Sequence, residues 1–171
     1  YHWRKTYAYE GSARVPFIVN HPTMDPTPSI DRPVGLEDVA PTLLEAANIS
    51  IPSSMDGLSV LSLLDGDPAW RDHYHGEHGP IYDPTNACQF IVDERWKYIW
   101  NPVTDDELLF DLQEDPQETR SLAEDADYGA QREQFRSSLV ETLRDRPEGF
   151  VHEGRLCAVD PEAWDVWEGA I

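Results

Sequence analysis

Apolar residues form one unbroken run near the start of this chain, at residues 15–19 (Val-Pro-Phe-Ile-Val). A short run of this kind is typical of a β-strand that is covered on both faces, so we expect a buried strand here. Residues 20–33 follow with four prolines among aspartate and serine, a composition that predicts an irregular surface loop.

A helical period begins at Asp38. Asp38 is a suitable amino-terminal cap, and Pro41 falls in the first turn, where its missing N–H is tolerated. The helix is expected to end near Asn48. Four apolar residues are expected to share its inward face: Val39, Leu43, Leu44 and Ala47.

From about residue 72 the period changes to two, which predicts strands. The sequence favours strands at 89–92, 96–100 and 108–112, with the first two joined by a tight turn at 93–95. Together with the segment HYHGEH at 73–78, they predict a small antiparallel sheet of three or four strands.

A second helix is predicted at 130–146, ended by Pro147 and Gly149. Its inward residues are expected to be Phe135, Leu139, Val140 and Leu143. An aromatic stripe alternates along one predicted strand: Trp96, Tyr98 and Trp100. Such a stripe usually lies in a core, here against the second helix, and a sugar-stacking platform is the alternative. Residues 150–171 show no period.

The charge of the chain is strongly negative. Thirteen basic residues stand against thirty-three acidic ones, which gives a formal net charge of -20 over 171 residues. A field of this sign repels nucleic acid and anionic membrane surfaces, so neither is an expected partner. Such acidity is also typical of proteins from salt-loving organisms, because high salt screens the self-repulsion. An ordinary acidic protein is the alternative.

The remaining totals indicate a globular domain. Hydrophobic residues make up 40% of the chain, and no stretch approaches the roughly 18 consecutive apolar residues of a membrane span. The chain begins at Tyr1 rather than Met, so we expect it to be the later part of a longer polypeptide, and its localisation stays open. Cys88 and Cys157 fit no zinc motif; one disulfide between them is an alternative to two buried thiols, which we prefer.

Lysine is scarce: arginine supplies eleven of the thirteen basic residues, and Lys5 and Lys97 are the two lysines. An ammonium group is a compact charge with three donors, which suits a tetrahedral sulfuryl or phosphoryl group. Lys5 lies ahead of Glu10-Gly11 and the apolar run, and loops at the ends of buried strands are where open α/β sheets bind ligands. Lys5 is therefore a candidate catalytic residue, with a surface lysine as the alternative. Glu10 and Arg14 are expected to form an ion pair.

The segment DHYHGEHG is the second candidate for chemistry. On a strand, His73, His75 and Glu77 share one face and His78 faces the other way, so a three-histidine metal cluster requires a bend. Side chains that hydrogen-bond a hydroxylated substrate are the better interpretation, since Gly76 and Gly79 permit a close approach. The candidate substrate-binding residues are therefore Glu77, His78 and His75, and solvated histidines at a strand end are the alternative.

The acidic segment DLQEDPQE, residues 111–118, raises the question of calcium. Its spacing lacks the glycine and the terminal glutamate of a calcium-binding loop, so we expect a solvated turn. No metal ligand is therefore assigned within this chain.

Three segments resemble the sulfatases of the alkaline-phosphatase-like superfamily. They are KTYAYEGSARVPFIV, GLEDVAPTLLEAANISIPSSMDGLSVLSLLDGD and RWKYIWNPVTDDELLFDLQEDPQETRSLAED, and they occur in the family's order over about residues 3–146. The first and third are quite specific together. The HGEHG segment also resembles sulfatases that act on carbohydrates.

The resemblance implies an α/β fold in two parts. Residues 1–70 are expected to supply the last strand and covering helices of a large catalytic α/β domain. Residues 71–171 are expected to form a small carboxy-terminal domain, a four-stranded antiparallel sheet packed on a helix. The implied partners are a sulfated carbohydrate or small-molecule substrate and the rest of the sulfatase chain.

The resemblance also implies hydrolysis of sulfate esters by a formylglycine nucleophile, with a calcium ion polarising the sulfate. Formylglycine arises within a C/S-x-P/A-x-R motif, which neither cysteine fits, and the Asp/Asn metal ligands are expected upstream of Lys5. Of the catalytic set only Lys5 carries over, as the residue that binds the sulfate and steadies the leaving oxygen. The chain alone is accordingly expected to be inactive. Two alternatives stay open: a phosphonate or phosphate ester hydrolase of the same superfamily, and a non-catalytic truncated module.

Overall fold

The computed structural model describes residues 6–20, 29–64, 69–80 and 83–161. By its contacts the chain divides into two compact units, one made of residues 1–15 with 75–171 and the other of residues 16–74. None of the helices in the described ranges has the length and hydrophobicity that a bilayer crossing requires.

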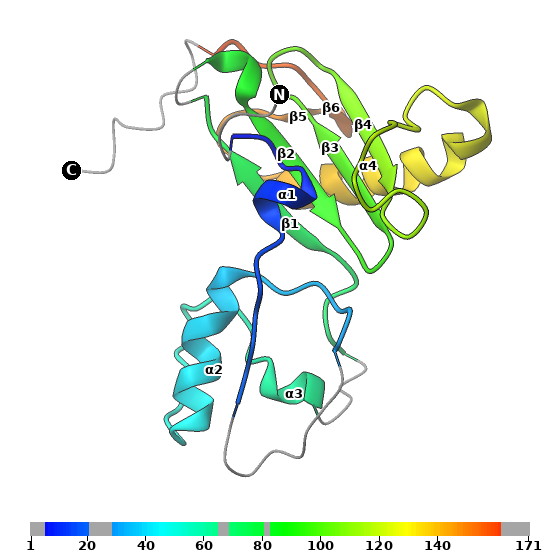
Figure 1. The fold of residues 1–171 in the computed structure, drawn as a ribbon. Coiled ribbons are helices and arrows are strands. Elements are labelled where there is room, and N and C mark those ends of the chain that lie inside the picture. Colours follow the sequence, from blue (N-terminus) through cyan, green and yellow to red (C-terminus); the bar gives the residue numbers. More distant parts are fainter. Residues whose placement is uncertain (1–5, 21–28, 65–68, 81–82, 162–171) are drawn as a thin grey trace. The chain divides into compact units, whose positions relative to one another are not determined.

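The larger unit carries an antiparallel sheet (Figure 1). Its strands lie in the spatial order β1 (Tyr74–His78), β2 (Cys88–Val92), β3 (Trp96–Trp100) and β4 (Glu107–Asp111). Spatial order follows sequence order, so the sheet is a meander with short connections. The four-stranded sheet predicted from the period of two is confirmed, and the predicted bounds of β2, β3 and β4 differ from the observed ones by at most one residue.

Asp93 closes the tight turn between β2 and β3. Its Oδ1 accepts hydrogen bonds from the backbone N–H groups of Arg95 (2.7 Å) and Trp96 (2.6 Å), the local arrangement that aspartate favours in turns. The register that follows places Val92 opposite Lys97. Because side chains alternate along a strand, Trp96 and Lys97 then face opposite sides of the sheet.

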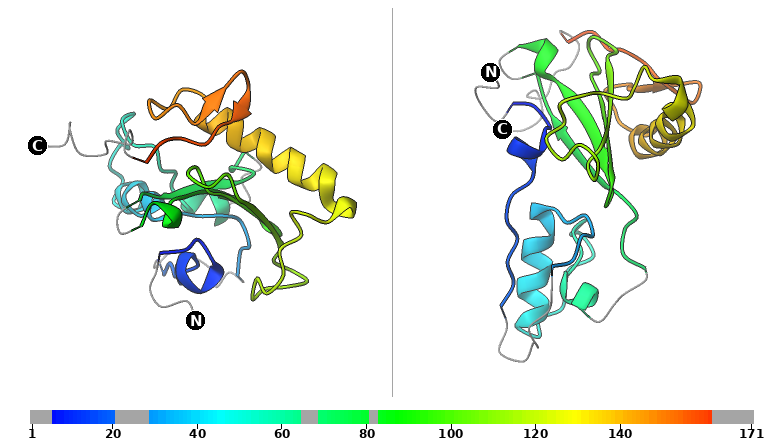
Figure 2. Two further views of the ribbon diagram at one scale, coloured as in Figure 1. Left: turned by 90° about the horizontal axis from the view of Figure 1, so that it is seen from above. Right: turned by 45° about the vertical axis from the view of Figure 1, so that its right-hand side comes forward.

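Helix α4 (Gly129–Leu143) covers one face of this sheet, and the short α1 (Glu10–Ala13) lies on the opposite face (Figure 2). The buried residues of α4 are the four predicted to face inward: Phe135, Leu139, Val140 and Leu143. All but Val140 share one core with Tyr98 and Trp100 of β3, which are fully buried. The aromatic stripe is therefore part of the core, as predicted, and the sugar-stacking interpretation is wrong for these two residues.

A short hairpin after α4 was not apparent from the sequence. β5 (Val151–His152) and β6 (Arg155–Leu156) pair antiparallel around Glu153 and Gly154, which both have positive φ. Positive φ at both central residues is the geometry of the tight turn whose twist matches that of paired strands. Phe150, just before the hairpin, is fully buried in the core. Two-residue strands are too short to show a period.

The apolar run at 15–19 does not form the predicted strand. No strand is assigned to it within the described ranges, and the exposed fractions of Val15 and Ile18 are 50% and 88%. A strand persists only where its backbone N–H and C=O groups pair with a neighbour, and the described residues place no strand beside this segment.

The described residues of the smaller unit include three short helical segments: η1 (Leu36–Asp38), α2 (Val39–Ala46) and α3 (Leu61–Leu64). The predicted end of the helix is confirmed, since Asn48 has a positive φ of 54° just after α2. The predicted inward face is wrong. Leu43 is 65% exposed, whereas Thr42 is buried, because its Oγ1 donates to the carbonyl of Asp38 and accepts from the N–H of Val60.

Both cysteines are free thiols. Cys88 is buried on β2, and burial raises the pKa of its thiol to about 11, so it stays protonated at neutral pH. Cys157 is partly exposed. The preference for thiols over a disulfide is thus confirmed, although only one of the two is buried.

Candidate functional site

Lys5, the predicted catalytic residue, lies outside the described residues. The description begins at Thr6, so what the structure defines is the anchorage of the segment that follows Lys5. Thr6 and Ala8 are buried in the larger unit. Ala8 packs in a small apolar cluster with Ile99 of β3 and Phe110 of β4. This segment is therefore fixed against the sheet within a few residues of Lys5.

The second lysine of the chain is buried at the same place. The side chain of Lys97, on β3, is 1% exposed. Its Nζ donates to the carbonyl oxygen of Ala8 (2.9 Å), to Oε1 of Glu10 (2.5 Å) and to Oε1 of Glu118 (2.9 Å). An ammonium group has three N–H donors, and all three are used. We call Lys97, Glu10 and Glu118 the Lys97 cluster.

Two carboxylates share this one ammonium group. Glu118 also accepts the backbone N–H of Glu10 through Oε2, which ties the two acidic residues together. Nη1 of Arg14 lies 3.6 Å from Oε2 of Glu10, so the predicted Glu10–Arg14 ion pair is confirmed. Arg14 is largely exposed, and its positive charge offsets part of the charge of the two carboxylates, which exceeds that of Lys97 alone. Since an unpaired buried charge costs several kcal/mol, each member of the cluster requires the others.

The acidic segment at 111–118 forms the predicted turn, but two of its carboxylates are buried rather than solvated. Asp111 and Glu118 have exposed fractions of only 4% and 7%. Arg95 holds Asp111 through Nε (3.0 Å) and Nη2 (2.6 Å), and these hydrogen bonds keep the pKa of that carboxyl below its usual range. These two carboxylates are buried because each pairs with a cation at or beside β3, a contact that local spacing does not reveal.

An open cavity of about 430 Å³ lies beside the Lys97 cluster. Its walls are residues 7, 9–12 and 116–118, which contribute tyrosine rings, a serine hydroxyl and a glutamine amide. Glu10 and Glu118 also line it, and their charges are paired with those of Lys97 and Arg14.

On β1 the structure brings together two of the three predicted substrate-binding residues. Nε2 of His75 lies 2.8 Å from Oε1 of Gln89, and Nε2 of Gln89 donates to Oε2 of Glu77 at 3.1 Å. Gln89 is fully buried on β2, so a fixed amide orients both side chains. Nη2 of Arg146 lies 3.0 Å from the same oxygen of Glu77. The predicted shared face is confirmed.

The sequence did not reveal Gln89 or Arg146 as part of this group. Gln89 reads as an ordinary strand residue, and Arg146 is 69 residues from Glu77 along the chain. Glu77 remains 44% exposed beside both, with lone pairs available to accept further hydrogen bonds.

His78, the third predicted residue, does not join the contact group of His75 and Glu77. Its Nδ1 is buried and has no hydrogen-bond partner among the described residues. The close approach expected at Gly76 is taken by the ring of Phe90, whose Cζ lies 2.2 Å from where a Cβ would stand, and not by a ligand. Space around Gly79 is open.

Metal ligation has little support in this part of the protein. Within the ranges that the structure describes, no group of three or more His, Cys, Asp or Glu side chains is arranged to hold a metal ion. The site residues described here are accordingly suited to hydrogen bonding and charge pairing.

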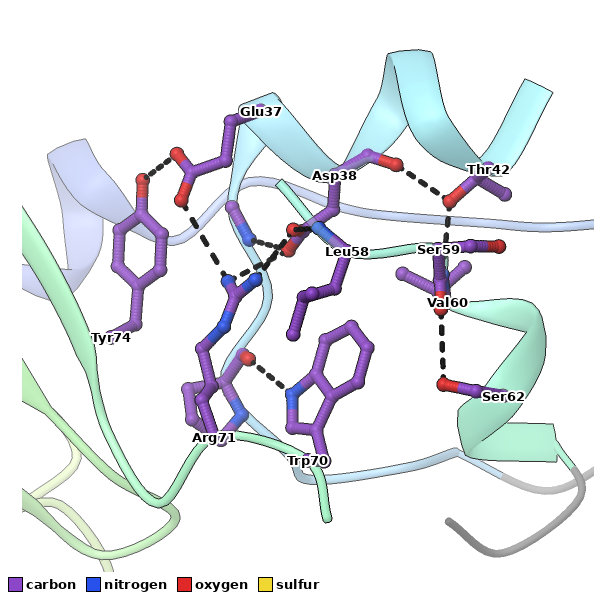
Figure 3. A network of polar contacts seen from close by, with 12 residues as sticks. Glu37, Asp38, Thr42, Leu58, Ser59, Val60, Ser62, Trp70, Arg71 and Tyr74 are labelled. Atoms are coloured by element: carbon purple, nitrogen blue, oxygen red, sulfur yellow. Dashed lines mark hydrogen bonds and ion pairs between the residues drawn. The ribbon is translucent and has the colours of Figure 1, made fainter. Parts of the chain in front are cut away.

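A second polar network lies in the smaller unit and is centred on Asp38 (Figure 3). Asp38 is fully buried, and Arg71 donates to both of its carboxylate oxygens, at 2.9 and 2.6 Å. The backbone N–H groups of Gly35 and Leu58 donate to the same carboxylate, each at 2.8 Å. A carboxylate with four donors has no capacity left for a substrate, so this network is structural. The predicted helix cap is wrong, because the Asp38 side chain makes no capping hydrogen bond to α2 and binds Arg71, Gly35 and Leu58 instead.

Comparison with known proteins gives this geometry a family. The protein-family model described as "N-sulphoglucosamine sulphohydrolase, C-terminal" matches residues 1–145 of this chain. An arylsulfatase of Clostridium perfringens is 36% identical over 159 residues, which cover 90% of this chain and 32% of the relative. An N-acetylglucosamine-6-O-sulfatase of Bacteroides thetaiotaomicron is 27% identical over 149 residues, which cover 82% of this chain and 26% of the relative. The chain thus spans about a third of the length of these relatives, or less.

A solved structure agrees with the fold. The structure of a protein in complex with its substrate D-glucosamine-2-N,6-O-disulfate superimposes with a TM-score of 0.57 at 23% identity, over 63% of this chain and 23% of that one. The resemblance drawn from the three sequence segments is therefore confirmed, as is the alkaline-phosphatase-like α/β fold class. This chain belongs to the sulfatase family, in the part that corresponds to the carboxy-terminal model of N-sulphoglucosamine sulphohydrolase.

Proposed function

We propose that this chain is part of an enzyme that hydrolyses sulfate esters of carbohydrates, with Lys5 binding the sulfate group. The observation that carries the proposal is the family match over residues 1–145, which includes the segment with Lys5. The carbohydrate substrate is supported by a relative named for N-acetylglucosamine 6-O-sulfate and by a structural neighbour with a sulfated glucosamine substrate.

The role of Lys5 follows from its charge. An ammonium group beside the ester places a positive charge where negative charge grows on the sulfate oxygens and on the departing oxygen. The described residues offer no cluster that fits a calcium ion, and neither cysteine lies in a formylglycine motif. We propose that both groups are supplied from outside this chain, where they would provide the Lewis acid and the nucleophile.

His75, Glu77 and His78 are proposed to contact the sugar. Glu77 is held by Gln89 and Arg146 with part of its carboxylate exposed, an arrangement that suits acceptance of hydrogen bonds from sugar hydroxyls. The buried Nδ1 of His78, without a partner among the described residues, is a further polar atom that a substrate could satisfy.

Residues 1–70 are proposed to belong to the large catalytic domain and residues 71–171 to the small carboxy-terminal one, with residues 8–10 of the first held against the sheet of the second. The exposure of Ile18 and Leu43 supports the first assignment, since apolar side chains at 88% and 65% exposure are typical of surfaces that another part of a protein covers. The order of β1 to β4 with α4 on one face supports the second.

The direct test is an assay of the longer enzyme against paired sulfate and phosphate esters. We expect turnover of a glucosamine 6-sulfate and of an aryl sulfate, and much slower turnover of the matching phosphates. The 171-residue chain assayed alone is expected to show no turnover of any of these esters. Faster turnover of phosphate or phosphonate esters would assign the chain to the hydrolase alternative, and turnover by the isolated chain would show that the catalytic groups lie within it.

Glu77→Gln in the same enzyme tests the sugar contact. The neutral amide keeps the shape but weakens the acceptor, so KM for the sulfated sugar is expected to rise about tenfold. An aryl sulfate has no sugar hydroxyls, and its KM is expected to stay unchanged. The matched control is Glu148→Gln, because Glu148 also pairs with Arg146, at 2.7 Å. Equal effects on both substrates would contradict a role in sugar binding.

A further inference from the structure

The Lys97 cluster raises a question that the family does not answer: why an ammonium group should lie buried in the middle of a sheet. A lysine side chain pays for desolvation and loses its rotamer freedom when it is enclosed. Hydrophobic residues of similar volume often replace buried ion pairs without loss of stability. The interpretation to test is therefore that buried Lys97 positions other residues, rather than that it stabilises the fold.

We propose that Lys97 is a positioning residue, which holds residues 8–10 against the sheet and thereby sets where the ammonium group of Lys5 is presented. This inference rests on the proposed function. It assigns to the second lysine of the chain the task of orienting the first.

The contacts of Lys97 support this role because two of its hydrogen bonds go to the same short segment, residues 8–10. Nζ holds the backbone of Ala8 through its carbonyl oxygen and the side chain of Glu10 through its carboxylate. Glu118 connects Lys97 to the same segment a further time, since it accepts from Nζ of Lys97 through Oε1 and from the N–H of Glu10 through Oε2. The segment is thus fixed by charge-assisted hydrogen bonds, which are shorter and stronger than neutral ones.

Chain length makes the grip relevant to Lys5. Lys5 lies three positions before Ala8, and a chain of that length reaches about 10 Å at most. Ala8 also packs against Ile99 and Phe110, so a displaced Ala8 would have to leave an apolar cluster. Because a misplacement of about 1 Å at a catalytic group can cost about 100-fold in rate, a small release at Ala8 is expected to be visible in turnover.

The first experiment measures the grip on the 171-residue chain, by amide hydrogen exchange in Lys97→Met. We expect faster exchange at Glu10, whose N–H binds Glu118, and at the α1 amides of Ser12 and Ala13, which donate to the carbonyl of Tyr9. Arg95→Met is the matched control. It breaks the ion pair of Arg95 with Asp111, which lies beside the same loop but does not touch residues 8–10. Unchanged exchange at these amides in Lys97→Met would overturn the proposal.

The second experiment measures turnover in the longer enzyme, at a temperature where each variant is folded by circular dichroism. We expect Lys97→Met to lower kcat on an aryl sulfate by about 100-fold with little change in KM, and Arg95→Met to leave both values near those of the parent. Glu10→Gln serves if Lys97→Met does not fold, because the amide oxygen still accepts from Nζ while the ionic attraction is lost; an intermediate loss of kcat is then expected.

The outcomes separate the two proposals. Increased exchange with unchanged kcat in an active enzyme would overturn positioning, since the segment would be loosened without effect on catalysis. A parent enzyme without sulfatase activity would overturn the proposed function, and with it the role of Lys97, whatever the exchange data show. Increased exchange together with a selective loss of kcat supports the inference.

Discussion

Replacement of Lys5 by alanine is expected to lower kcat/KM of the longer enzyme toward a sulfate ester by about 100-fold or more. Removal of one well-placed donor from a developing oxyanion costs about 10²–10³ in kcat, and Lys5 is proposed to serve both the sulfate and the leaving oxygen. Lys5→Arg is not expected to restore the rate, because a planar guanidinium presents its donors in a different geometry. Initial rates with an aryl sulfate give the value.

The control for Lys5 is Arg14→Ala. Arg14 is a cation of the same segment, with a side chain that is 73% exposed, and its ion pair with Glu10 spans 3.6 Å. Loss of such an exposed pair is worth about 1 kcal/mol at most, so the rate is expected to change by less than about fivefold. If Lys5→Ala behaves like Arg14→Ala, Lys5 is an ordinary surface residue and the catalytic assignment is wrong.

Asp38→Ala is expected to destabilise the smaller unit by about 3–5 kcal/mol, the typical loss when one partner of a buried ion pair is removed. The substitution leaves the guanidinium of Arg71 and the N–H groups of Gly35 and Leu58 without their shared acceptor. Urea unfolding of the 171-residue chain measures the loss. Hydrogen exchange at the Leu58 amide locates it in this unit.

Glu37→Gln is the control for Asp38. Glu37 is 43% exposed and contacts Arg71 at 3.8 Å, so it belongs to the same network but at its surface. The hydroxyl of Tyr74 donates to Oε2 of Glu37, a bond that the amide oxygen of glutamine can also accept. The expected change is below about 1 kcal/mol. An equally small change in Asp38→Ala would mean that apolar packing, and not this network, holds the unit together.

The parts of the fold that the sequence predicted are those in which the pattern and its partners lie close together along the chain. β2, β3 and β4 follow one another through short turns, and three of the four buried residues of α4 share a core with the aromatic residues of the sheet that precedes it. A hydrophobic period of two or of 3.6 residues is then enough to predict the strand or the helix, because each element buries its own apolar face against a neighbour.

The parts that were missed depend on distant residues. Lys97 meets Glu10 across 87 positions and Glu118 across 21, and Arg71 meets Asp38 across 33. A local pattern of charged residues is typical of a solvated surface, so these buried pairs were not predicted. One signal was available for Lys97: a lysine at the centre of an apolar strand, in a chain that otherwise uses arginine.

The exposed run at 15–19 has a consequence for handling the chain by itself. An apolar, extended segment with no strand of the described chain beside it is a template for pairing with a second copy, the first step of self-association. Pro16 removes one backbone donor from that template, and the net charge of -20 keeps copies apart. Salt at about 0.1 M shortens the reach of that repulsion to about 10 Å. Ionic strength therefore decides whether the isolated chain stays dispersed in solution.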